Sequence, residues 1–103
     1  MVLSARTESA ISNLAREIDG IAIPFDANDP EDVRTYIANV EDSVGPIDVL
    51  INNAGIEKNT LIEDITEKEI EETLRINLIT PQVLTADVLP RMLSRGSGHL
   101  VYT

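Results

Sequence analysis

The chain has 103 residues, a formal net charge of −10 and no cysteine. This length suits one domain at most, the negative charge argues against nucleic-acid and anionic-membrane partners, and the lack of cysteine excludes a disulfide framework. His99 is the only histidine, so a metal site or a serine–histidine–aspartate triad has almost nothing to draw on. No apolar stretch is long enough for a membrane span and no signal-peptide pattern opens the chain, so we expect a cytoplasmic protein.

Short apolar runs alternate with segments of helical periodicity along the chain. The predicted strands cover residues 2–5, 21–26, 47–51 and 99–103, and the predicted helices lie within 7–20, 28–46 and 66–94. Asp29 is the predicted N-cap of the second helix, Thr66 and Glu69 form a capping box before the third, and Gly20 is the predicted stop of the first.

This alternation, with such short connections, predicts right-handed crossovers and a parallel sheet, hence an α/β fold. The unbroken apolar run Val49–Ile51 favours a strand that helices cover on both faces. Pro24 can donate no ladder hydrogen bond, so the strand at 21–26 should lie at a sheet edge.

Ligands of open parallel sheets bind at the carboxyl ends of the strands. The chain places Arg6, Asp26 and the segment Asn52-Asn53-Ala54-Gly55 there. The two adjacent amides supply several donors and acceptors, and Ala54 and Gly55 leave the backbone open to a flat ligand. The alternative, that the amides only connect neighbouring strand ends, stays open for Asn52.

The segment GPIDVLINNAGI, residues 45–56, resembles the Asn-Asn-Ala-Gly signature of the short-chain dehydrogenase/reductase family. Further segments match that family in order: VLSAR its second strand, FDANDPEDV its third strand and next helix, LRINLITPQVLTADVLPRML its long interface helix, and GHLVYT its fifth strand. The resemblance implies a partial doubly wound, Rossmann-like parallel sheet that lacks the first strand and the C-terminal part. It implies one partial NAD(P)-binding domain over residues 1–103.

The resemblance also assigns roles at the cofactor. Asp26 and Ala27 match the pair that lies against the adenine ring. The three residues after Asn52, namely Asn53, Ala54 and Gly55, match the stretch beside the cofactor's ribose, and Asn52 itself is implied to brace the sheet.

Asn77 matches the asparagine of the family's catalytic tetrad, whose carbonyl holds a water that relays protons to an active-site lysine. The residues alone also single it out. Pro81, four residues later, has no N–H, so the carbonyl of Asn77 loses its helical hydrogen bond and is free for another donor. A kinked helix with a water-satisfied carbonyl and no chemistry is the alternative, and the resemblance favours the relay.

Arg6 and Thr7 follow the first predicted strand, where the ribose of a dinucleotide is expected. Family members that prefer NAD resemble one another in having an acidic residue at the end of this strand, whereas this chain has Ala5 and then Arg6. Arginine can donate two hydrogen bonds to a 2′-phosphate. We therefore expect NADP as the preferred cofactor and NAD as a possible one; the alternative is a surface arginine at a helix entrance.

The chain departs from the family in two ways: the glycine-rich phosphate loop is absent, and so are the catalytic serine, tyrosine and lysine. Tyr36 and Tyr102 both lack a lysine four residues on. We therefore expect an internal piece of an oxidoreductase that acts on a carbonyl or secondary alcohol, inactive alone, whose parent is a homodimer or homotetramer through residues 66–94. The alternatives are a non-catalytic α/β module and a catalytically dead dinucleotide-binding remnant.

The missing strand leaves two possible sheets. The family's strand order, 3-2-1-4-5, puts it between the strands at 2–5 and 47–51, and both neighbours would then carry an unpaired inner edge. The halves either stay apart around a slot one strand wide or pair directly. We expect direct pairing, because an empty slot would leave apolar helix faces uncovered.

Overall fold

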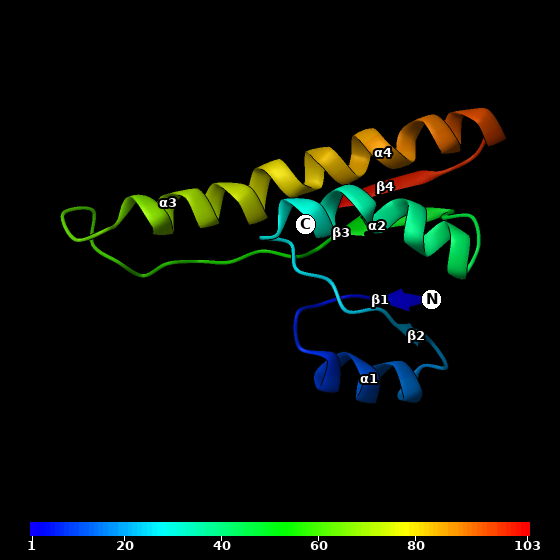
Figure 1. Ribbon diagram of the computed structural model, residues 1–103, viewed down its shortest axis with the longest axis horizontal. Coiled ribbons are helices and arrows are strands. Elements are labelled where there is room, and N and C mark those ends of the chain that lie inside the picture. Colours follow the sequence, from blue (N-terminus) through cyan, green and yellow to red (C-terminus); the bar gives the residue numbers. More distant parts are fainter.

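Strands and helices alternate along the whole chain in the computed structural model, which describes residues 1–103 (Figure 1). The elements are β1 (Val2–Leu3), α1 (Glu8–Glu17), β2 (Ile21–Ala22), α2 (Pro30–Ser43), β3 (Val49–Asn52), α3 (Glu67–Leu74), the π-helical turn η1 (Arg75–Ile79), α4 (Thr80–Arg95) and β4 (His99–Tyr102). This order confirms the predicted α/β fold. No helix is both long enough and apolar enough to cross a bilayer.

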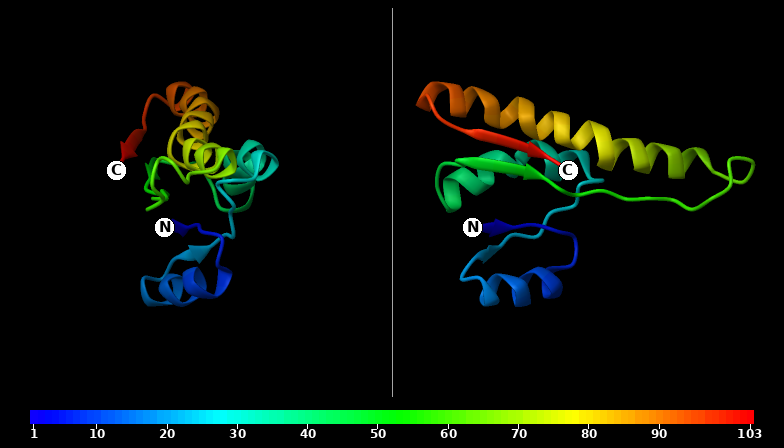
Figure 2. Two further views of the ribbon diagram at one scale, coloured as in Figure 1. Left: turned by 90° about the vertical axis from the view of Figure 1, so that its left-hand side faces the viewer. Right: turned by 180° about the vertical axis from the view of Figure 1, so that it is seen from behind.

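The four strands form two separate parallel pairs rather than one sheet. β1 pairs with β2, with Val2 opposite Ile21, and β3 pairs with β4, with Val49 opposite His99. No ladder joins β1 to β3, and the views in Figure 2 show the two pairs apart. The prediction of parallel pairing is confirmed, and the expectation that the inner edges pair directly is wrong.

Side chains beyond β2 explain why the two pairs stay apart. Phe25 and Ala27 belong to the core that α2 and α4 enclose. Tyr36 of α2 packs on Phe25 with ring centroids 4.4 Å apart, and its hydroxyl is 2.5 Å from the Ser4 hydroxyl just after β1. These contacts hold the end of β1 and the segment after β2 against α2, while the inner edges of β1 and β3 stay unpaired.

β2 is an outer edge, as Pro24 predicts. It pairs with β1 alone. Beyond β2, the amides of Ile23 and Phe25 donate to Leu3 and Ala5 at 2.9 and 3.2 Å. Pro24 lies between these two donors, so its missing N–H falls on the side away from β1 and costs the ladder nothing.

The core lies between the β3–β4 pair and the helices α2 and α4, which cover one face of it. The nine residues of this cluster are Phe25, Ala27, Val33, Ile37, Leu50, Ile76, Leu84, Val88 and Met92. On the opposite face of β3, Val49 and Ile51 are 51% and 59% exposed. The expectation that helices cover β3 on both faces is therefore wrong for this structure, because α1 packs on β1 and β2 instead.

The helix ends follow local chemistry. The Asp29 side chain accepts from the Glu31 amide at 2.9 Å, and both hydrogen bonds of the Thr66–Glu69 capping box form. Asp19, with φ of 53°, takes the left-handed conformation after α1, so the predicted stop at Gly20 is displaced by one residue. Aspartate tolerates this region better than most side chains.

Pro81 leaves the long helical run continuous. The segment from α3 through α4 appears as one rod in Figure 1. Immediately before Pro81 the backbone widens into the π turn η1, in which the Thr80 amide donates to the Arg75 carbonyl. A π turn absorbs one extra residue and shifts the hydrogen-bond register. The backbone before Pro81 therefore changes its hydrogen-bond register, and the helical run predicted over 66–94 continues.

Glu41 joins the C-terminal ends of α2 and α4 to the start of β3. Its carboxylate accepts from Arg91 at 3.0 Å, from Arg95 at 3.1 Å and from the Ile47 amide at 3.0 Å. Arg95 also donates to the Ile47 carbonyl at 2.7 Å. The hydrogen bond from Ile47 is the main cause that lowers the pKa of Glu41 below its ordinary 4.5, and both arginines act in the same direction.

We predict that Glu41→Gln lowers the free energy of unfolding of this chain by about 1 kcal/mol at neutral pH. Because folding lowers the pKa of Glu41, its stabilisation is full above the unfolded-state value of 4.5 and is lost as pH falls through the folded-state value. The difference in the free energy of unfolding between the wild-type chain and Glu41→Gln should therefore vanish in acid. Urea unfolding at several pH values measures this.

Glu31→Gln is the matched control. It removes an ion pair with Arg34 whose side chains are 73% and 65% exposed, and exposed pairs contribute little. An equal loss of stability in both variants would contradict the role given to Glu41.

Candidate functional site

The amide side chain of Asn77 connects η1 to the loop that follows β3. Its Oδ1 accepts from the Ile56 amide at 2.8 Å, and its Nδ2 donates to the Ile56 carbonyl at 2.8 Å. An asparagine that pairs with both backbone groups of one residue fixes that residue as a neighbouring strand would. Asn77 therefore sets the position of the chain immediately after Gly55.

The backbone at Ala54 and Gly55 is open. Both residues are exposed, and a Cβ built on Gly55 would meet only the Oδ1 of Asn77, at 3.5 Å. Gly55 has no positive φ, so neither its conformation nor crowding by the protein demands glycine. The lack of a side chain leaves a bare strip of backbone at the carboxyl end of β3, where a flat ring can lie.

Asn52 and Asn53 differ in their surroundings. The Asn52 carbonyl accepts from the Thr103 amide at 3.2 Å, while the Asn53 Oδ1 accepts from the Thr103 hydroxyl at 2.8 Å. Asn52 is only 9% exposed, and its Nδ2 has no hydrogen-bond partner. An orphaned buried donor is costly, so the carboxyl end of β3 carries a group that still lacks its acceptor.

Asp26 and Ala27 occupy the turn between β2 and α2. Asp26 Oδ1 accepts from the Asn28 amide at 2.9 Å, and the carbonyl of Ala27 accepts from the Thr80 hydroxyl at 2.7 Å. Thr80 lies three residues after Asn77. Ala27 on the adenine side, and Ile56 directly after the ribose-side candidates, are thus both hydrogen-bonded to one stretch of helix, residues 77–80.

Arg6 and Thr7 lie on the surface at the start of α1. Both are exposed, and Thr7 is the N-cap of α1 without a side-chain capping bond. Lys58 bonds Glu72 at 2.9 Å and is the main cause that lowers the pKa of Glu72, and the charge of Arg6 acts in the same direction. The Arg6 guanidinium therefore lies on the side of the molecule that faces α3.

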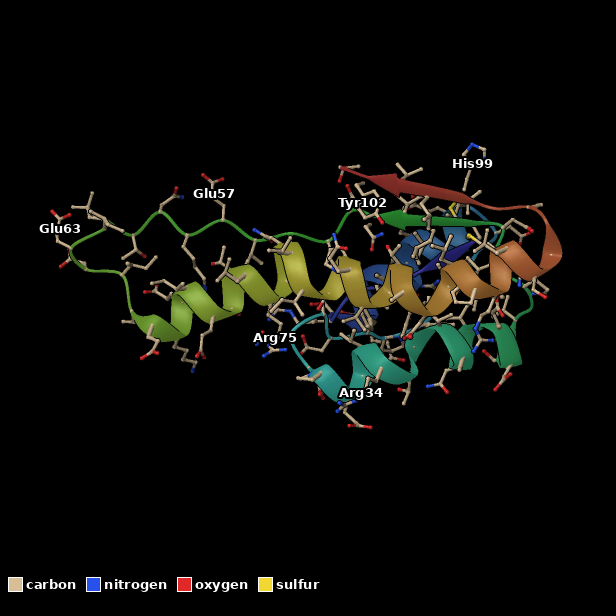
Figure 3. The ribbon with its side chains drawn as sticks, turned by 90° about the horizontal axis from the view of Figure 1, so that it is seen from above. Arg34, Glu57, Glu63, Arg75, His99 and Tyr102 are labelled. Carbon is tan, nitrogen blue, oxygen red and sulfur yellow. The ribbon has the colours of Figure 1, made fainter.

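A hollow of about 400 Å³ separates the loop after Gly55 from α3. Its apolar lining includes Ile56, Ile65, Ile70 and Leu74, and Asn77 also borders it. Glu57 and Glu63 point outward from the same loop (Figure 3). Leu61 and Ile62 at the loop tip are 64% and 84% exposed, so they are not tucked into the core. No group of three acidic or histidine side chains is close enough to hold a metal.

These features fit a dinucleotide along the carboxyl ends of the strands. The bare backbone at Gly55 can receive a flat ring, and Arg6, at the end of β1, supplies an exposed cation. Nothing in the residues present blocks such a ligand.

The direction of the Asn77 carbonyl stays a prediction, and the pairing of the Asn77 side chain with Ile56 was not predicted from the sequence. The hydrogen bond of Thr80 to Ala27 was not predicted either. The available signal was Pro81, because a register change just before a proline turns the preceding hydroxyl away from its usual partner one turn back.

The chain matches the model of the family described as short chain dehydrogenase over residues 1–103. It is 37% identical to a ketoacyl reductase, HetN, of Nostoc sp. over 106 residues, which cover 98% of this chain and 37% of that relative. The chain thus spans well under half of the length of this relative.

Two solved structures have the same arrangement of elements. One is a metagenomic short-chain oxidoreductase in complex with NADP, with a TM-score of 0.90 and 26% identity over 98% of this chain and 48% of that one. The other is a short-chain dehydrogenase of Sphingobium yanoikuyae in complex with NADPH, with a TM-score of 0.89 and 27% identity over 98% of this chain and 42% of that one.

We predict that Asn77→Ala raises the amide hydrogen-exchange rate of Ile56 about tenfold, because the substitution removes both side-chain bonds to that residue. Exchange measured by NMR or mass spectrometry tests this. Asn59→Ala is the control, since Asn59 is an exposed amide in the same loop. Unchanged protection of Ile56 would mean that other contacts hold the loop.

Proposed function

Because the chain belongs to the short-chain dehydrogenase/reductase family, we propose that it is part of an NAD(P)-dependent oxidoreductase. The complete enzyme transfers a hydride between a nicotinamide cofactor and a carbonyl or secondary alcohol substrate. The observation that carries this proposal is the pairing of Asn77 with Ile56 directly after the open backbone of Ala54 and Gly55. It combines a candidate relay residue and a candidate cofactor surface in one place.

The bound cofactor supplies the hydride chemistry, and this chain's residues bind and orient it. Asp26 and Ala27 present the turn for the adenine ring. Asn53, Ala54 and Gly55 form the surface for the ribose, with Asn52 buried behind them. Arg6 and Thr7 lie where a 2′-phosphate is expected, at the end of β1.

Asn77 has two separable tasks in this proposal. Its side chain positions the loop at Ile56, and its carbonyl, which Pro81 cannot reach with an N–H, holds the water of the proton relay. The tyrosine that acts as acid and base toward the substrate, the lysine that lowers the pKa of that tyrosine, and the catalytic serine come from outside these residues. The apolar hollow bordered by Asn77 is the proposed location for the substrate's carbon skeleton, and the long helical run from α3 to α4 is the proposed contact between subunits.

A catalytically dead remnant of the same fold is the competing possibility. The gene sequence on either side of this chain distinguishes the two: a glycine-rich segment upstream and a Tyr-x3-Lys segment downstream accompany an active enzyme, and their absence would indicate the remnant.

We predict that the 103-residue chain alone catalyses no carbonyl reduction with NADH or NADPH, since it contains no tyrosine–lysine pair to donate the proton. The loss of reduced-nicotinamide absorbance, followed spectrophotometrically in preparations free of host reductases, measures this. Turnover above the uncatalysed rate would refute the proposed division of roles.

We predict that the complete enzyme prefers NADP(H) and that Arg6→Ala lowers kcat/KM for NADPH about tenfold while leaving NADH nearly unchanged, because only NADPH carries the 2′-phosphate. Steady-state kinetics with both cofactors measures this. Arg16→Ala, at an exposed arginine in the last turn of α1, is the control. A wild-type enzyme that works equally well with NADH would overturn the preference.

A further inference from the structure

Thr80 makes the one side-chain hydrogen bond that lies wholly in the interior of this chain. Its hydroxyl donates to the Ala27 carbonyl at 2.7 Å. Thr80 is 4% exposed and Ala27 is 8% exposed. The bond joins residues 53 positions apart in sequence, from the start of α4 to the turn between β2 and α2.

Three other helical hydroxyls bond within their own helix, whereas Thr85 of α4 bonds the exposed Tyr102 hydroxyl. Thr35, Ser43 and Thr73 donate to the carbonyl four residues earlier, at 3.2, 2.6 and 2.7 Å. This local bond is the usual choice for a hydroxyl inside a helix. Thr80 follows the π turn, which shifts the register of the residues after it. Its hydroxyl therefore reaches a different segment.

The turn that receives this bond satisfies most of its other polar groups locally. Asp26 Oδ1 accepts from Asn28, the Asp29 amide donates to the Asp26 carbonyl at 3.0 Å, and Asp32 accepts from the Asp26 amide at 2.6 Å. The Ala27 carbonyl is buried beneath them and relies on Thr80. Loss of the donor would leave a buried acceptor unpaired.

We propose that Thr80 is a positioning residue for the adenine end of the cofactor, an inference that rests on the oxidoreductase function proposed above. The Thr80 hydroxyl fixes the position of the Asp26–Ala27 turn relative to α4. Asn77, three residues earlier, fixes Ile56 beyond the ribose-side residues. One helical turn thus sets the distance between the two loops that contact the two ends of the adenosine.

The test uses the complete enzyme with Thr80→Val, which keeps the size and β-branching of the side chain but removes the donor. Calorimetry should show that the Kd values for NADP⁺ and for 2′,5′-ADP, the adenosine half of the cofactor, rise about tenfold. Turnover with reduced nicotinamide mononucleotide, which lacks the adenosine half, should stay unchanged. Thr80→Ser keeps the hydroxyl and should restore both Kd values.

Thr35→Val is the matched control, because Thr35 donates only to carbonyls within its own helix. Unchanged binding of 2′,5′-ADP by Thr80→Val would overturn the inference. An equal loss with the mononucleotide would also overturn it, since that pattern indicates general damage to the fold. Failure of the wild-type enzyme to bind any nicotinamide dinucleotide would instead refute the proposed function.

Discussion

Ile37 of α2 and Val88 of α4 are 1% and 0% exposed, and the packing of these two helices holds β3 and the segment after β2 in place. Leu50 of β3 is buried beneath them, and Phe25 and Ala27 bring the end of β2 into the same cluster. Each large buried aliphatic side chain contributes on the order of 2 kcal/mol by its removal from water. Displacing α2 from α4 would therefore free both β3 and the turn at Asp26.

The candidate site depends on this packing through the π turn. Thr80, the first residue of α4, is buried against the Asp26–Ala27 turn, and Asn77 faces the loop at Ile56. An uninterrupted α-helix would rotate these two residues differently relative to each other, because one residue fewer would fill the turn. Pro81 removes an amide from the regular ladder at this point. The helix therefore loses a backbone hydrogen bond in the same segment that bonds the two loops, at Ile56 and Ala27.

The gap between β1 and β3 shows how side-chain contacts can outweigh unpaired strand edges. Tyr36 packs on Phe25 and bonds Ser4, and the partial burial of its hydroxyl against the core raises the pKa of Tyr36. In this structure the Tyr36 contacts are present, and the backbone hydrogen bonds that β1 and β3 could form with each other are not. The outward faces of Val49 and Ile51 remain open to solvent because α1 packs on β1 and β2 and does not cover them.

The sequence by itself determined the local elements: helix caps at Asp29 and Thr66, the edge position of the strand with Pro24, and the α/β alternation are each decided by chemistry within a few residues. It also identified the segment Asn52–Gly55, because polar and small residues at a strand end stand out against apolar surroundings, and Asn77, because Pro81 four residues later has no N–H for its carbonyl. Only the tertiary structure decided that β1 and β3 stay apart, that Asn77 pairs through its side chain with Ile56, and that Thr80 serves Ala27. Each of these depends on contacts between segments far apart in sequence, and such contacts follow from how α2 packs on α4, which no local pattern specifies.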